Sequence, residues 1–199
     1  MSLPLGIEAQ FGTWLDRRPL LVAIAGPNGA GKTTFYESRL AQTGLRLVNA
    51  DRIAVALGVD PYRAAAMADQ LRRVLVHERE SFIFETVFSD PQGAKLAFLA
   101  EAASAGFAVV LIFIGIAGVD RSSERVAMRV SQGGHDVPAE KLVQRFPRTL
   151  VNLAAALTSV PAVFIYDNDD SQWPFRLVQI HEQGQRRWRS ATAPPWVPA

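Results

Sequence analysis

Short, nearly continuous apolar runs recur along the chain, and longer stretches with apolar residues at every third or fourth position separate them. A short apolar run bounded by Gly, Pro or polar residues is typical of a buried strand. The longest run, over residues 107–116, has the composition of a central strand in a parallel sheet, which is buried on both faces. We therefore expect strands over residues 20–25, 45–48, 82–84, 107–116, 162–166 and 175–181.

Capping residues mark the starts of two of the expected helices. Asp60-Pro61 and Asp90-Pro91 each place an Asp, a good N-cap residue, before a Pro that suits the first helical position. A Gly follows several of the amphipathic stretches and marks their ends. The first four expected helices cover residues 6–17, 32–41, 61–81 and 91–105.

Two further helices are expected in the second half of the chain. Ser122 or Ser123 can cap the first of them, which ends near Gly133. Val137-Pro138 opens the second, and Pro147 within it should kink or split that helix, because Pro lacks the amide proton of a helical residue.

The alternation of strands and helices predicts an α/β fold with three layers, in which helices cover both faces of a mostly parallel sheet of five or six strands. We expect a single domain over residues 1–199, with its core at about 20–181 and an extended, Pro-rich tail at 193–199. Ligands of such sheets bind beyond the carboxyl ends of the strands. The residues that follow each strand are therefore the candidates for chemistry.

Composition limits the class of protein. The chain has 199 residues, of which 49% are hydrophobic and 20% charged, and these values are typical of one globular domain. No apolar run is long enough to span a bilayer, and the first ten residues do not resemble a signal peptide, so we expect a cytoplasmic protein without a membrane partner. The absence of Cys excludes disulfides, thiol catalysis and Cys-bound metals. A formal net charge of +2 does not indicate a nucleic-acid partner, and the basic cluster at 186–189 is expected to be a solvated end.

A phosphate-binding loop follows the first expected strand. Gly-x-x-x-x-Gly-Lys-Thr lies between a strand and a helix, which is the context that this motif requires. The glycines allow the backbone amides to surround phosphate oxygens at the positive end of the helix. Lys32 is expected to contact the β- and γ-phosphates of ATP, and the Thr33 hydroxyl to bind Mg²⁺. The motif predicts a P-loop NTPase fold of the nucleoside-monophosphate-kinase type, with a nucleotide site formed by Gly26, Pro27, Asn28, Gly29, Ala30, Gly31, Lys32, Thr33 and Thr34.

Asp51 follows the second expected strand and lies opposite the phosphate loop in this topology. A carboxylate there can take the proton of an acceptor hydroxyl, so Asp51 is our candidate catalytic base and a candidate substrate contact. The alternative is that Asp51 caps the segment 52–57, since Asp is a good N-cap residue.

Glu85 and Thr86 directly follow the third expected strand. Glu85 can bind substrate hydroxyls or hold Mg²⁺, and Thr86 can add a hydrogen bond to the substrate. The alternative for Glu85 is a strand-end residue paired with a nearby Arg. Glu is poorly suited to a buried strand end, which favours the functional interpretation.

Arginines recur every four residues at Arg121, Arg125 and Arg129, and a helix would place them on one face. Such a face can cover the nucleotide and neutralise charge that develops on the γ-phosphate. Arg125 and Arg129 are the candidates, with a solvated basic face as the alternative. Arg145 and Arg148 form a second set, from which one residue can contact substrate phosphate.

These residues together resemble the zeta toxin family of small-molecule kinases. The resemblance extends from about residue 20 to 181. It rests on the phosphate loop together with Asn49-Ala50-Asp51, Phe84-Glu85-Thr86 and Gly133-Gly134-His135-Asp136-Val137-Pro138. The combination is much more specific than the phosphate loop, which a very large class of proteins shares.

The resemblance implies a P-loop kinase that uses ATP and Mg²⁺ and phosphorylates a sugar hydroxyl of UDP-N-acetylglucosamine. It implies that Asp51 is the catalytic base, that Lys32 and Thr33 hold the nucleotide and the metal, and that Glu85-Thr86 belongs to the substrate site. The family's toxins pair with a small antitoxin protein.

The resemblance also assigns Arg125 or Arg129 to the lid over the nucleotide. The best-known toxins carry a further Arg shortly before the Pro of the next helix, where this chain has Gly133-Gly134-His135. Arg145 or Arg148 is the candidate to replace that arginine.

The function that we expect is therefore an ATP-dependent phosphotransferase acting on a hydroxyl of a small molecule, with UDP-N-acetylglucosamine as the first candidate. Two alternatives stay open at this point. One is an ATP-binding or ATP-hydrolysing switch or binding module, and the other is a kinase for another metabolite or an antibiotic.

Overall fold

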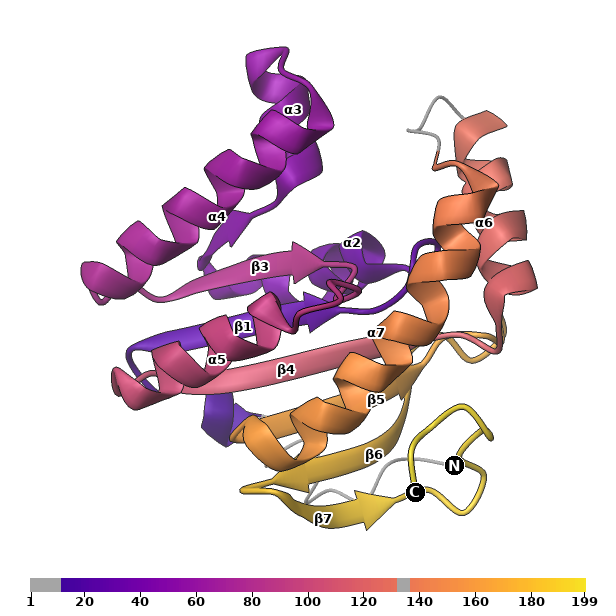
Figure 1. Ribbon diagram of the computed structural model, residues 1–199. Coiled ribbons are helices and arrows are strands. Elements are labelled where there is room, and N and C mark those ends of the chain that lie inside the picture. Colours follow the sequence, from indigo (N-terminus) through magenta and orange to yellow (C-terminus); the bar gives the residue numbers. More distant parts are fainter. Residues whose placement is uncertain (1–11, 132–136) are drawn as a thin grey trace.

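A seven-stranded sheet forms the centre of the protein, with the strand order β2-β3-β1-β4-β5-β6-β7 (Figure 1). The computed structural model describes residues 12–131 and 137–199. The predicted fold class is confirmed, although the sheet has more strands than the five or six expected. The strands are β1 (Leu20–Ala25), β2 (Arg46–Val48), β3 (Phe82–Thr86), β4 (Ala108–Gly115), β5 (Ala162–Asp167), β6 (Arg176–Glu182) and β7 (Gln185–Arg189).

The first five strands are parallel, and β6 and β7 add to them as antiparallel strands. Both faces of the sheet are covered, so β1, β4 and β5 are apolar nearly throughout. Along β1, Leu21 packs into one core cluster and Leu20 into the other. The alternation of side chains along a strand thus divides the core into two halves.

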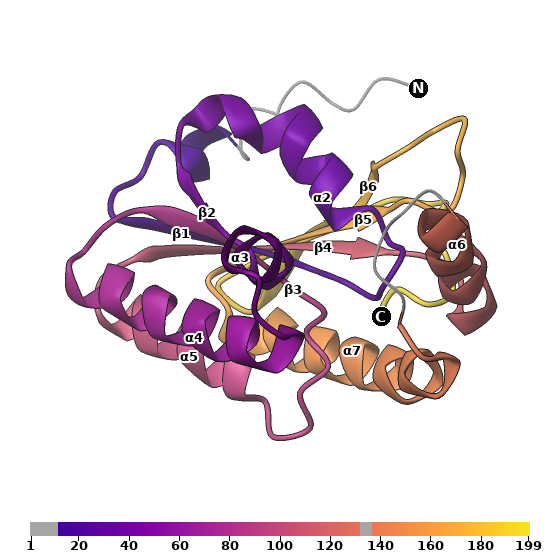
Figure 2. The ribbon, with the colours of Figure 1, turned by 90° about the horizontal axis from the view of Figure 1, so that it is seen from above.

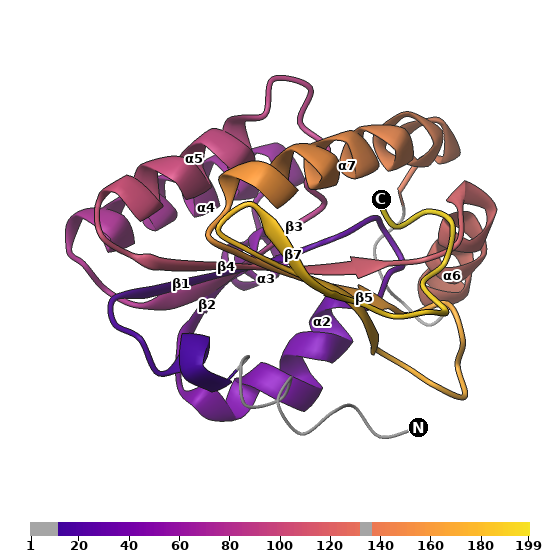
Figure 3. The same cartoon turned by 90° about the horizontal axis from the view of Figure 1, so that it is seen from below.

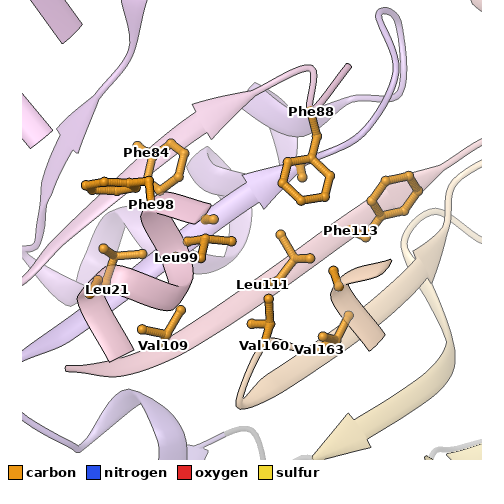
Figure 4. Packing of buried hydrophobic residues seen from close by; sticks show 14 of the residues in the cluster. Leu21, Phe84, Phe88, Phe98, Leu99, Val109, Leu111, Phe113, Val160 and Val163 are labelled. Carbon is orange, nitrogen blue, oxygen red and sulfur yellow. The ribbon is translucent and has the colours of Figure 1, made fainter. Parts of the chain in front are cut away.

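Helices cover the two faces unequally. α4, α5 and α7 pack on one face, and the helical run that begins with α2 covers the other (Figures 2 and 3). Figure 4 shows the larger core half, in which Phe84 and Phe98 make an edge contact with ring centroids 5.9 Å apart. The helices are α2 (Lys32–Phe35), α3 (Ala50–Leu57), α4 (Pro61–His77), α5 (Ala94–Ser104), α6 (Val119–Ser131) and α7 (Ala139–Ser159), and the run from α2 continues through η1 (Tyr36–Leu40) and η2 (Ala41–Thr43).

The two Asp-Pro signals have different outcomes. Asp60 caps α4 as predicted, because its carboxylate accepts hydrogen bonds from the amides of Tyr62 and Arg63. The helix predicted to begin at Pro91 begins instead at Ala94, after Gly93 with a φ of 66°. The Asp90 carboxylate still accepts a hydrogen bond from the Ala94 amide, so it satisfies the helix end across a turn.

The cap predicted for the next helix is wrong: α6 begins at Val119, so Ser122 and Ser123 both lie inside it. Of the two outcomes predicted for Pro147, the split does not occur, because α7 runs through that residue. Thr149 and Asn152 hold α7 in place, because they donate hydrogen bonds to the carbonyls of Val87 and Phe88.

A helix was also predicted over residues 6–17. Within the part of this range that the structure describes, residues 12–15 are helical. No helix in the described ranges is long and apolar enough to cross a membrane.

The C-terminal tail is packed, not extended as predicted, whereas Arg186 and Arg187 of the basic cluster are exposed, in line with the predicted solvation. The basic cluster 186–189 belongs to β7, which pairs with β6. The tail then turns back, so that Val197 is 3% exposed and the Trp196 ring lies against Gly115 at the end of β4. The Arg189 guanidinium donates to the Pro198 carbonyl at 2.5 Å. Sequence patterns did not show this docking because it depends on tertiary contacts, of which that between Trp196 and Gly115 spans more than 80 positions.

We expect Val197→Asp to lower the free energy of unfolding by about 2 kcal/mol or more, because it buries a carboxylate without a partner. Ala199→Asp is the control, since Ala199 is exposed, and should change stability by about 0.5 kcal/mol or less. Denaturant titration followed by circular dichroism measures both values. Equal stability of the two variants would show that the tail does not pack as described.

Candidate active site

A cleft of about 460 Å³ opens at the carboxyl ends of β1 and β3, where ligands of parallel sheets bind. The phosphate loop and α6 form one wall, and α3, α4 and the start of α5 form the other (Figure 1). Six cationic and three acidic side chains line it, so the cleft suits an anionic ligand. The lining residues are Asn28, Gly29, Gly31, Lys32, Thr33, Thr34, Asn49, Ala50, Asp51, Pro61, Ala65, Ala68, Asp69, Arg72, Glu85, Thr86, Val87, Lys95, Arg125, Arg129 and Arg145.

The phosphate loop has the backbone conformation that its glycines predict. Gly26 has a φ of 143°, and a Cβ atom there would lie 2.0 Å from the Ile114 carbonyl oxygen. Gly31 has a φ of 91° and directly precedes α2. No residue type other than Gly fits at position 26 without a shift of β4. The conformation of Gly31 directs the loop amides toward the cleft.

Distant segments hold the loop from behind. The Ser122 hydroxyl of α6 donates to the Asn28 carbonyl at 2.7 Å. The Asn168 amide, just past β5, donates to the Ala30 carbonyl at 2.8 Å and accepts from the Phe175 amide. These contacts satisfy loop carbonyls and leave loop amides available to a ligand. Neither contact followed from the sequence, where Ser122 was only a candidate cap.

Lys32 lies inside the cradle. Its ammonium group donates to the carbonyls of Gly26 and Pro27, each at 2.9 Å. Burial, assisted by the charge of Arg129, lowers the pKa of Lys32 to about 8, although the charges of Glu85 and Asp51 oppose this shift. A phosphate bound here would supply the counter-charge that the buried ammonium group lacks.

Thr33 and Glu85 meet at the base of the cleft. The Thr33 hydroxyl donates to Glu85 Oε2 at 3.0 Å. Glu85 Oε1 is buried and accepts no hydrogen bond from the described residues. Burial raises the pKa of Glu85, and Lys32, Thr33 and Asn49 act against that rise. A hydroxyl and a carboxylate with an unused buried oxygen fit Mg²⁺, which binds oxygen ligands and commonly pairs one carboxylate with substrate phosphates.

Asp51 lies in the first turn of α3 and lines the cleft. The alternative that it caps this helix is wrong: Asn49 is the cap, and its side-chain oxygen accepts from the Arg52 amide at 3.0 Å. The Asp51 carboxylate is exposed and therefore accessible to a ligand.

The predicted arginines separate into two groups. Arg125, Arg129 and Arg145 line the cleft, whereas Arg148 is exposed and does not. Arg125 also donates to the Asp169 carbonyl at 3.0 Å, which fixes α6 above the phosphate loop. Arg121 is paired with Glu124 and Asp169 outside the cleft.

Thr86, the other residue predicted at the end of β3, also lines the cleft. Its hydroxyl accepts a hydrogen bond from the Phe88 amide at 3.1 Å. The segment Gly133-Gly134-His135-Asp136 that carried part of the family resemblance lies outside the described residues.

Four polar residues of the cleft were missed in the sequence: Asn49, Asp69, Arg72 and Lys95. Asn49 appeared only as part of a family motif. Asp69 and Arg72 share one stripe of α4 with Ala65 and Ala68, and that stripe was the available signal. Lys95 comes near them only through the packing of α5.

The sequence model of the family described as Zeta toxin matches residues 58–176 of the chain. No curated protein sequence matches at a significant level.

Several solved structures have a similar fold. The structure of AvrRxo1-ORF1:-ORF2 with ATP matches with a TM-score of 0.66 and 17% identity, over 90% of this chain and 62% of the other. The structure describing the PezAT toxin-antitoxin system of Streptococcus pneumoniae matches with a TM-score of 0.53 and 15% identity, over 81% of this chain and 75% of the other. The Pnkp1/Rnl/Hen1 RNA repair complex matches with a TM-score of 0.56 and 18% identity, over 70% and 46%. The chain thus spans less than two thirds of the AvrRxo1 chain that it matches.

We expect Gly26→Ala to destabilise the protein by about 2 kcal/mol or more, because the new methyl group meets the β4 backbone and the φ angle is unfavourable. Gly118→Ala is the matched control, since a Cβ there meets no atom within 4 Å, and should cost about 1 kcal/mol or less. Urea titration measures both. A Gly26→Ala protein as stable as the control would contradict the close approach of the loop to β4.

Proposed function

Because the chain belongs to the zeta toxin family, we propose that it is an ATP-dependent kinase that phosphorylates a hydroxyl group of a small molecule. The observation that carries this proposal is that Lys32 and Asp51 line one cleft from opposite walls. A phosphate cradle alone binds a nucleotide. A cradle that faces an accessible carboxylate provides both halves of a phosphoryl transfer site.

The phosphate loop is the donor half. Its amides would bind the phosphates of ATP, and Lys32 would exchange the carbonyls of Gly26 and Pro27 for phosphate oxygens. The buried and unusually acidic ammonium group favours a ligand that restores its full charge.

Thr33 and Glu85 are the residues that would hold Mg²⁺. The hydrogen bond between them places two oxygen ligands side by side, and Glu85 Oε1 is unused. When bound, Mg²⁺ would neutralise charge on the transferred phosphoryl group. In this proposal Glu85 serves the metal more than the acceptor.

Asp51 is the proposed catalytic base. It would orient the acceptor hydroxyl by accepting its hydrogen bond and would take its proton during transfer. Arg129 is the proposed γ-phosphate arginine, since its charge acts directly on Lys32. Arg145 enters the cleft from α7 and is the proposed second arginine, in preference to the exposed Arg148.

For the acceptor we propose a nucleotide sugar, with UDP-N-acetylglucosamine as the first compound to test. The support is the family membership and the cationic lining of the cleft, which favours an acceptor with phosphates of its own. A kinase that acts on an uncharged metabolite or antibiotic would need cationic side chains only in the donor half of the cleft, where ATP binds.

We also propose a small antitoxin protein as a partner. Two similar structures are described as AvrRxo1-ORF1 with ORF2 and as the PezAT toxin-antitoxin system. Co-purification of the chain with the product of a neighbouring gene tests this part of the proposal independently of catalysis.

Replacing the base tests the kinase proposal. We expect Asp51→Asn to reduce acceptor-dependent ATP consumption by about 10²-fold or more, because the amide cannot take the proton, while ATP binding is retained. Asp120→Asn is the control, since Asp120 is exposed on α6 and does not line the cleft.

The readout for both variants is a coupled ADP assay with a panel of hydroxyl acceptors. A wild-type protein that no acceptor stimulates, with Asp51→Asn as active as wild type, would contradict the proposal and favour a nucleotide-dependent switch.

The pH dependence of ATP binding tests the role of Lys32. The pKa of Lys32 is about 8 in the free protein, and bound phosphate should raise it toward its ordinary value. The affinity for ATP should therefore be constant below about pH 7 and fall as the pH rises through about 8 to 9, with proton uptake on binding. Calorimetry in two buffers of different ionisation enthalpy measures both effects.

In Lys32→Gln the fall in affinity should be absent, and in Lys141→Gln, which changes a lysine outside the cleft lining, it should persist. An affinity that does not change over this pH range in the wild type would show that Lys32 is not the ligand of the phosphates.

A further inference from the structure

The wall of the cleft opposite the phosphate loop carries a second set of charges. One stripe of α4 contributes Ala65, Ala68, Asp69 and Arg72, and α5 adds Lys95 beside them. The two alanines leave space in front of the charged groups. Two cations face a single carboxylate here, so this end of the cleft has a positive excess among the lining residues.

Arg72 is a fixed cation. The residue is 5% exposed, yet it lines the cleft. Its guanidinium group lies 4.8 Å from the centroid of the Phe84 ring and 5.8 Å from that of Phe98, two rings of the packed core (Figure 4). Aromatic faces attract the cation and limit its motion. A buried guanidinium is costly unless it is paired, and burial lowers the pKa of Arg72 to about 10.

Lys95 and Arg72 form ion pairs with the same carboxylate, that of Asp69. Its ammonium group lies 2.7 Å from Asp69 Oδ1, and the same oxygen pairs with Arg72 Nη2. Burial and the charge of Arg72 nevertheless lower the pKa of Lys95 to about 8. The half-exposed Asp69, together with the charge of Asp90 that also acts on Lys95, therefore compensates the two cations only in part. An added anion would be stabilised between them.

This set of charges is separate from the donor half. The charges that act on Lys32 are those of Glu85, Arg129 and Asp51. Those that act on Lys95 are Arg72, Asp90 and Arg73. The two lysines thus belong to different electrostatic environments within one cleft.

The backbone around Lys95 is also held in place. α7 fixes the loop before α5, because Asn152 donates to the carbonyls of Phe88 and Asp90 at 2.9 and 3.0 Å. The carboxylate of Asp90 caps the first turn of α5, in which Lys95 lies. Preorganised cations bind an anion with little loss of conformational entropy.

We propose that Arg72 and Lys95 form a second anion-binding subsite, which holds a phosphate group of the acceptor while a hydroxyl of the same molecule faces Asp51. The planar guanidinium group can form two parallel hydrogen bonds to phosphate, and the ammonium group adds a third. Before the acceptor binds, the Asp69 carboxylate pairs with both cations and keeps them in place. The phosphate group of the acceptor then competes with Asp69 for them. The inference rests on the proposed function in one respect, since it identifies the ligand as the acceptor.

Inorganic phosphate is the probe for the subsite. The wild-type protein, saturated with a non-hydrolysable ATP analogue and Mg²⁺, should bind one further phosphate ion by calorimetry. Lys95→Gln and Arg72→Gln should each weaken that binding by about tenfold or more, since each removes a charged hydrogen-bond donor. Asp69→Asn should strengthen it, because the competing carboxylate is gone.

Arg63→Gln is the matched control. Arg63 also lies on α4, but it is exposed, does not line the cleft and is not among the charges that act on Lys95. Phosphate affinity should be unchanged in this variant, and the affinity for the ATP analogue should be unchanged in all four. If Arg72→Gln does not fold, Lys95→Gln and Asp69→Asn carry the test in opposite directions.

Two further experiments test whether the subsite binds the acceptor, and whether the subsite exists even if the kinase proposal fails. In the ADP assay, phosphate should inhibit in competition with the acceptor and not with ATP, and Lys95→Gln should raise the KM for a phosphorylated acceptor by about tenfold without changing that for ATP. Phosphate binding to Lys32→Gln protein needs no nucleotide, so it tests the subsite even if ATP proves not to be the donor.

Equal phosphate affinity in wild type and Lys95→Gln, or a loss of binding in Asp69→Asn, would overturn the proposal. The three residues would then serve only to tie α4 to α5. Competition of phosphate with ATP alone would likewise assign the ion to the phosphate loop and reject the second subsite.

Discussion

Hydrogen bonds from distant parts of the chain hold the phosphate loop, and the rest of the site depends on them. The loop must present free amides to a ligand, so it cannot use those amides to stabilise itself. Its carbonyls are satisfied instead by Ser122 and Asn168, which lie 94 and 138 positions from their partners. The same two contacts fix α6 and the turn after β5 at the cleft. The loop therefore orients the elements that carry the arginines, and they in turn orient the loop.

Electrostatics give the cleft its two halves. Lys32 and Lys95 are both buried enough to have pKa values of about 8, yet different neighbours surround them. Glu85 lies at the end of β3 and Asp51 on the wall opposite Lys32, and a metal ion and an acceptor hydroxyl are proposed to meet between them. Buried charges of this kind contribute little to stability by themselves. Their arrangement is better explained by the ligands that would complete them.

The parts of the fold that depend on local sequence were predictable, and the parts that depend on distant contacts were not. β1, β4 and β5 are buried on both faces, so their apolar runs could not have another meaning. Asp60 and Asp90 look alike in sequence, but only the first is followed directly by a helix, because Gly93 inserts a turn after the second. The same holds for the cleft. Its residues that directly follow a strand could be named from the sequence, whereas Arg72 lines the cleft only because α4 packs on β3.

The long separation of these contacts has a consequence for the order in which the protein is made. The phosphate loop is synthesised early, but Asn168, which holds it, and Trp196, which covers the end of β4 beside it, emerge much later. Domains fold largely as units during synthesis. The nucleotide cradle therefore cannot reach its final geometry on a nascent chain until Asn168 and Trp196 have left the ribosome. The amides of the cradle are thus made long before the segments that shape it, and the site is assembled late in synthesis.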